Sequence, residues 1–203
     1  QGWPFGLLVH DMVERFLLYF FTQSAHSATR GTWTTPESQR IDRDTGGWPY
    51  ASPGQANVPM AIKWMLAFEE PESRTLWLAK ATPREWLAAG EAPIVGTNLT
   101  SRYGRISFSL RASGSGRGGD GYTVSANLTL PASFASSAPA GGLRLRLRAP
   151  LEHAGRLSSV TIGGAVWSEF DAAEETIEIA ASKMTLSLIR DRLPSIVASF
   201  GGS

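Results

Sequence analysis

The sequence predicts an α+β protein in which a helical part is followed by an antiparallel β-sandwich. Apolar residues recur at three- and four-residue spacing in the first part of the chain, whereas short segments with alternating apolar and polar residues follow residue 90. Helices followed by strands indicate two packing units. We therefore expect a helical segment with a long functional loop over residues 1–90 and a β-sandwich domain over residues 91–203.

Two helices are predicted in the first part. The first covers residues 5–21, where apolar residues occupy one broad face and part of the opposite face. The second covers residues 58–69 and places Pro59 in its first turn, where the missing amide hydrogen costs little. Two such helices cannot enclose a core by themselves. We therefore expect their remaining apolar surface to pack against a preceding part of the same protein or against a partner chain.

The second part is predicted to form short strands joined by glycine-rich turns. A short strand at Leu76 and a helical turn ending at Gly90 precede them. The expected strands cover residues 104–112, 122–130, 143–148, 159–162, 176–179 and 184–190. Residues 143–148 alternate leucine with arginine, which indicates leucines in the core and arginines on a solvated face. The apolar residues between 193 and 200 are expected to form a short helix.

Composition argues against several classes of partner and cofactor. The 203 residues include 19 basic and 18 acidic side chains, so no excess positive field favours nucleic acid or anionic lipid. The apolar run over residues 16–21 is much shorter than the roughly 20 residues that a membrane span requires. The absence of cysteine removes disulfides, zinc–thiolate sites and thiol nucleophiles. We expect no nucleic-acid partner, no membrane segment, no cofactor and no metal.

A loop of some thirty residues between the helices contains most of the residues suited to chemistry. Such long loops inside a compact unit are often functional. Its side chains are those that line sugar sites, because aromatic rings pack on pyranose faces while arginine, histidine and carboxylates bond to hydroxyl groups. The candidate substrate-binding residues are Arg30, Trp33, Trp48 and Tyr50.

Glu37 and His26 are the candidate catalytic residues. Glu37 follows Thr-Thr-Pro, so we expect a rigid segment to hold its carboxylate near an aromatic surface, where it could act as a general acid. Structural roles are open for the same residues: His26 could stabilise a helix end, and Arg30 could pair with Glu37 or Asp42. The tryptophans of the loop could pack against the loop itself.

Two Asn-Leu-Thr tripeptides begin at Asn98 and Asn127. They are glycosylation acceptors in a chain that enters a eukaryotic secretory pathway. The chain starts at Gln1 and shows no signal peptide, which suits a processed product. We therefore expect a secreted or extracellular glycoprotein.

The order of parts resembles the carboxyl-terminal region of six-hairpin glycosidase-like proteins, in which an (α/α)6 barrel precedes a β-sandwich. The segments on which this resemblance rests cover residues 10–16, 24–37 and 76–87 and the sandwich hairpins. The resemblance implies that residues 1–90 contain the last helices of an (α/α)6 toroid. It also implies a carbohydrate substrate.

The leading functional expectation is a glycoside hydrolase, with Glu37 as one of two carboxylates that flank the glycosidic bond. The second carboxylate is expected outside this chain. One alternative is a polysaccharide lyase, in which His26 or Tyr50 takes the proton beside a uronate and Arg30 neutralises its carboxylate. Another is a non-catalytic carbohydrate-binding or assembly subunit.

Overall fold

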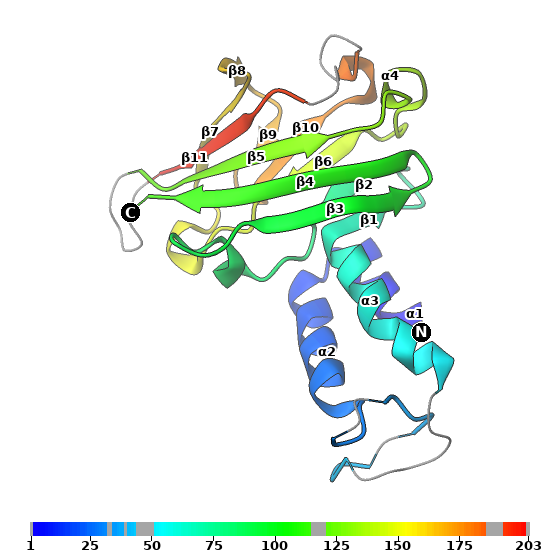
Figure 1. Cartoon of the computed structure of the whole chain (residues 1–203). Helices are drawn as coiled ribbons and strands as arrows, with labels where there is room; N and C mark the ends of the chain where they lie inside the picture. Colours follow the sequence, from blue (N-terminus) through cyan, green and yellow to red (C-terminus); the bar gives the residue numbers. More distant parts are fainter. Residues whose placement is uncertain are drawn as a thin grey trace. The chain divides into compact units, whose positions relative to one another are not determined.

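The computed structural model describes residues 2–31, 34–38, 40–43, 51–114, 121–185 and 193–201. The chain divides into two compact units, Gln1–Met65 and Leu66–Ser203. The first contains the three longer helices, and the second contains two sheets (Figure 1). This division lies well before the boundary expected at residue 90, because residues 67–69 and 76–78 form strands of a sheet with residues 143–146.

The helical unit contains α1 (Gly2–Val9), α2 (Val13–His26) and most of α3 (Ser52–Leu66). The single helix expected over residues 5–21 is therefore wrong. Asp11 has a φ of 54°, and two backbone hydrogen bonds close the end of α1, from Met12 N to Leu7 O at 2.7 Å and from Asp11 N to Leu8 O at 3.2 Å. This is the Schellman pattern, in which a left-handed residue ends a helix.

The third helix also differs from its prediction over residues 58–69. It begins at residue 52, so Pro59 lies in its interior rather than in its first turn. It ends at Leu66, and the next three residues form a strand. The rings of Phe5 and Trp64 meet edge to face at 5.3 Å and join α1 to α3. The described helices do not form a closed (α/α)6 toroid, and none of them is long and apolar enough to cross a membrane.

The first sheet has five strands in the order β1-β2-β6-β10-β9. β2 pairs with β6 in parallel, and the other pairs are antiparallel. The strands are β1 (Ala67–Glu69), β2 (Leu76–Leu78), β6 (Leu143–Arg146), β10 (Thr176–Ile179) and β9 (Phe170–Asp171).

The second sheet has six antiparallel strands in the order β3-β4-β5-β11-β7-β8. The strands are β3 (Ile94–Ser101), β4 (Gly104–Ser113), β5 (Thr123–Thr129), β11 (Ile196–Phe200), β7 (Leu157–Ile162) and β8 (Ala165–Trp167). Gly163 and Gly164 both have positive φ and join β7 to β8, as a two-residue hairpin turn requires. Within the described ranges, four short helical turns connect strands: η1 (Arg84–Leu87), α4 (Phe134–Ser137), η2 (Leu151–His153) and η3 (Ala181–Lys183).

Two predicted segments of the sheet unit need correction. The helix expected within residues 193–200 is strand β11, which lies between β5 and β7. Its buried residues Ile196, Ala198 and Phe200 alternate, so the small inward Ala198 concealed the period of two. Residues 184 and 185 of the strand expected over 184–190 are not in a strand, and the rest lie outside the described residues.

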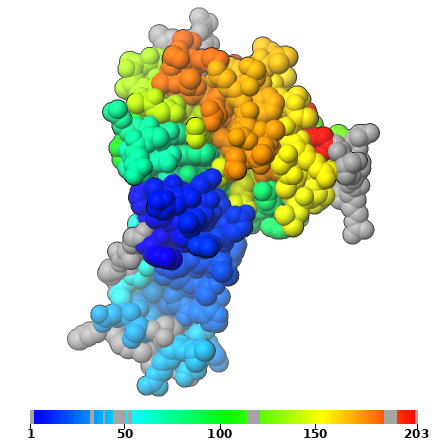
Figure 2. All heavy atoms as spheres, turned by 180° about the vertical axis from the view of Figure 1, so that it is seen from behind, coloured from blue at the N-terminus to red at the C-terminus, as the bar shows by residue number. Residues whose placement is uncertain are grey.

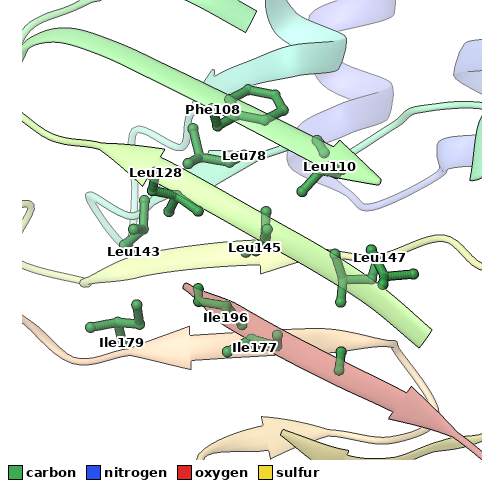
Figure 3. Close-up of a cluster of buried hydrophobic side chains, with 14 of the residues drawn as sticks. Leu78, Phe108, Leu110, Leu128, Leu143, Leu145, Leu147, Ile177, Ile179 and Ile196 are labelled. Carbon is green, nitrogen blue, oxygen red and sulfur yellow. The ribbon is translucent and has the colours of Figure 1, made fainter. Parts of the chain in front are cut away.

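Side chains from both sheets form one hydrophobic core, in which residues of facing strands point toward one another (Figure 3). Leu143, Leu145 and Leu147 are at most 1% exposed, so the predicted inward face of this segment is confirmed. The solvated arginine face is wrong for Arg146 and Arg148, which are each 5% exposed. Arg146 lies 4.9 Å from the ring of Trp77 and also bonds to Thr176 Oγ1 and Glu174 Oε2.

Candidate functional site

The structure places three of the predicted site residues in or beside the loop that follows α2. His26 is the last residue of α2, and the side chains of His26, Arg30 and Glu37 are all exposed. Exposure leaves the three side chains accessible to a ligand. Three further candidates, Trp33, Trp48 and Tyr50, lie outside the described residues.

Backbone and side-chain hydrogen bonds hold the described parts of this loop together. Arg30 N donates to Arg43 O at 3.2 Å, and Arg30 Nη2 donates to the backbone oxygen of Asp42 at 2.9 Å. In the opposite direction, Arg43 Nε donates to Ala28 O at 3.2 Å. Residues 28–30 and 42–43 are thus clamped to each other, and the Arg30 guanidinium contributes to the clamp.

The segment that contains Glu37 is held in the same way. Thr29 N donates to Thr34 O at 2.8 Å, and Ala51 N donates to Thr35 O at 2.9 Å. Pro36 is buried, whereas Glu37 next to it is exposed. Within the described part of the chain, the Glu37 carboxylate forms no ion pair, with Arg30 or with any other cation. An exposed carboxylate on a hydrogen-bonded loop is accessible to donate or accept a proton.

The two glycosylation candidates differ in their surroundings. Asn98 is exposed on the edge strand β3, at an irregularity of register between Gly96 and Leu99, and has a φ of 52°. Asn127 is half-buried in β5, opposite Ser109 of β4. Asn98 is therefore the more accessible of the two acceptors. Glycosylation at either residue stays a prediction.

Sequence reasoning missed a buried polar cluster in the sheet unit, centred on Glu175. Its carboxylate accepts hydrogen bonds from Arg84 Nη1 at 2.7 Å and from Gly155 N at 2.9 Å. The same Arg84 nitrogen donates to Ala149 O at 2.6 Å. Glu175 thereby ties together η1, the segment after β6 and the turn that follows η2. The residues of this cluster are far apart in the sequence, so no local sequence pattern predicts it.

Tyr122 and His153 extend this cluster into the core. Their rings stack at a centroid distance of 4.3 Å and an interplanar angle of 8°, and Tyr122 Oη donates to Leu87 O at 2.5 Å. His153 is 2% exposed, and neither Nδ1 nor Nε2 has a hydrogen-bond partner among the described residues. Buried polar atoms without partners are rare in native proteins.

Burial dominates the electrostatics of the cluster. It raises the pKa of the Glu175 carboxyl above its ordinary value, although the Gly155 amide and the Arg84 guanidinium act in the opposite direction. Burial, reinforced by the charges of Glu175 and Glu152, also raises the pKa of the Tyr122 hydroxyl. Perturbed groups of this kind occur at active sites and also in structural networks. Tyr122, His153 and Glu175 are at most 2% exposed and cannot reach a substrate, so we assign the cluster a structural role.

Among the residues that the structure describes, no group of three histidine or acidic side chains is arranged to hold a metal ion. Comparisons with protein-family models, curated proteins and solved structures found no match to this chain.

Proposed function

We propose that this chain belongs to a carbohydrate-active enzyme, a glycoside hydrolase in which Glu37 is one of the two carboxylates at the glycosidic bond. The observation behind the proposal is the state of Glu37, which is exposed and unpaired within the described residues and lies on a loop clamped by hydrogen bonds. A carboxylate already held by Arg30 would be less available for proton transfer.

The proposed division of roles follows from the chemistry of glycosidic bonds. Glu37 protonates the leaving oxygen, or attacks the anomeric carbon, and the second carboxylate comes from another segment or another chain. His26 and Arg30 bond to sugar hydroxyl groups, since imidazole and guanidinium groups both donate hydrogen bonds. Trp33, Trp48 and Tyr50 supply the aromatic surface for the sugar rings.

The test is the Glu37→Gln variant of the protein, produced in the cells that make it and purified with any chain that accompanies it. Turnover of a panel of neutral and uronate-containing polysaccharides is compared with that of the unchanged protein. We expect the variant to lose on the order of 10²-fold or more in kcat and to keep its binding, because glutamine preserves the size of the side chain and removes the acid.

A matched control is Glu72→Gln, which changes an exposed carboxylate in the turn between β1 and β2. It should leave turnover unchanged. Product analysis separates the two enzyme classes, because a lyase leaves an unsaturated end that absorbs ultraviolet light and a hydrolase does not. Equal turnover of Glu37→Gln and Glu72→Gln would refute the role of Glu37, and unsaturated products would replace the hydrolase with a lyase.

A further inference from the structure

A polar depression lies at the five-stranded sheet, and none of the residues discussed as loop candidates lines it. Its volume is about 360 Å³, within the range of roughly 300–1,000 Å³ that is usual for small-molecule sites. Strands β9 and β10, which adjoin it, are orange in Figure 2, on the side of the sheet unit that faces away from the viewer in Figure 1. The residues that line the depression are Gly141, Leu143, Arg144, Glu169, Glu178, Ile179 and Ala180.

Two ion pairs lie beside this depression. Arg144 of β6 and Glu178 of β10 are directly opposite in the strand register, and Nη2 of the arginine lies 2.9 Å from Oε1 of the glutamate. Glu169, just before β9, pairs with Lys183 of η3 at 2.5 Å. The four side chains are between 37% and 45% exposed. The charged groups therefore stay in contact with solvent and are accessible to a ligand.

Each cation is held by an aromatic ring as well as by a carboxylate. The Arg144 guanidinium lies 5.1 Å from the Trp77 ring, and Lys183 Nζ lies 4.6 Å from the Trp167 ring. The indole Nε1–H of Trp167 donates to the backbone oxygens of Glu169 at 3.2 Å and Glu178 at 3.0 Å. Groups fixed in this way lose little conformational freedom when a ligand binds.

The chemistry of the four groups selects a neutral ligand with many hydroxyl groups. The two positive and two negative charges cancel, so a charged ligand would have to compete with an existing ion pair. A hydroxyl group accepts a hydrogen bond from guanidinium or ammonium and donates one to a carboxylate, and each of these groups has more bonding positions than one ion pair uses. Adjacent hydroxyl groups of a sugar fit this alternation of donors and acceptors.

We propose that the depression between Arg144, Glu169 and Glu178 binds one sugar residue of a neutral saccharide. This site lies in the sheet unit and is separate from the Glu37 loop. It therefore adds a non-catalytic binding function and does not depend on the proposed hydrolase activity.

The experiment follows the Trp167 indole and backbone amides by ¹H–¹⁵N NMR while the full chain is titrated with D-glucose, D-galactose, D-mannose and D-xylose. We expect at least one sugar to shift the Trp167 indole signal and the amide signals of Gly141 and Ala180, with a Kd on the order of 1 mM. Glu178→Gln and Glu169→Gln should each weaken this binding by about tenfold, because each removes a charged acceptor.

Glu174→Gln is the matched control. Glu174 is an exposed carboxylate near the same sheet, and it pairs at 3.2 Å with Arg146, which belongs to the same strand as Arg144. It should leave binding unchanged. The proposal is overturned if no sugar shifts these signals, if all three variants weaken binding equally, or if glycine or glucuronate binds more tightly than the neutral sugars. None of these results bears on turnover at Glu37.

Discussion

Replacing His153 with phenylalanine should stabilise the sheet unit. The imidazole is 2% exposed, and both of its nitrogens lack hydrogen-bond partners among the described residues. A buried polar group without a partner costs about 1–3 kcal/mol, and an apolar group of similar shape removes that cost. Phenylalanine also keeps the stacking with Tyr122, at 4.3 Å in the present structure, which is worth roughly 0.5–1.5 kcal/mol for an aromatic pair. We therefore expect His153→Phe to raise the free energy of unfolding by about 1–3 kcal/mol.

Urea unfolding followed by circular dichroism measures this change as a shift of the midpoint at constant slope. Because a six-membered ring is larger than imidazole and overpacking is also destabilising, His153→Leu serves as a second variant. His10→Phe is the control, since residue 10 is exposed, and a surface change should stay within about 0.5 kcal/mol. If both His153→Phe and His153→Leu unfold more easily than the unchanged protein, the ring nitrogens have partners that stabilise the fold, and the reasoning is refuted.

Three further predictions follow from the burial or exposure of other residues. The pKa of Glu175 is raised in the folded protein above its ordinary value of 4.5, so its contribution to stability is fully present below that pH and falls as the pH rises through the folded pKa. The stability of the unchanged protein relative to Glu175→Gln should therefore decrease as the pH rises above 4.5, and an increase measured by urea unfolding would contradict this sign. Leu145→Ala should cost about 2–5 kcal/mol because Leu145 is 1% exposed in the core. Val166→Ala, at a position that is 87% exposed, should change stability by less than about 0.5 kcal/mol, and similar urea midpoints for the two variants would show that the register is wrong. Leu18→Ser should reduce the binding of a hydrophobic dye, because Leu18 is 70% exposed beside an apolar depression of about 520 Å³ that Trp3 and Leu7 also line; unchanged fluorescence would show that the dye binds elsewhere.

Some large apolar side chains of the helical unit are exposed. Trp3 and Leu18 are 71% and 70% exposed, whereas Leu8 and Phe16 are fully buried. The described helices thus leave apolar surface uncovered. What covers this surface stays a prediction.

Local sequence patterns predicted the strands in which large apolar residues alternate without interruption. The alternation of leucine and arginine over residues 143–148 predicted which face of β6 contributes to the hydrophobic core, because a strand places successive side chains on opposite faces. The pattern did not reveal that Arg146 would be buried against Trp77, which lies 69 positions away in the numbering and comes close only through the pairing of β2 with β6. Strand β11 was missed because Ala198 is too small to register as an inward position.

The candidate sites also divide into one that the sequence predicts and others that only the tertiary structure brings together. The loop that contains Arg30 and Glu37 was identified from residue types in one continuous segment, because aromatic, basic and acidic side chains gathered within thirty residues are visible in the sequence itself. The Glu175 cluster and the polar depression are assembled from strands and turns whose neighbours are set by the order of strands in the sheets. Only tertiary structure decides such contacts, because the free energy that aligns two distant strands comes from the shared core and not from either segment alone.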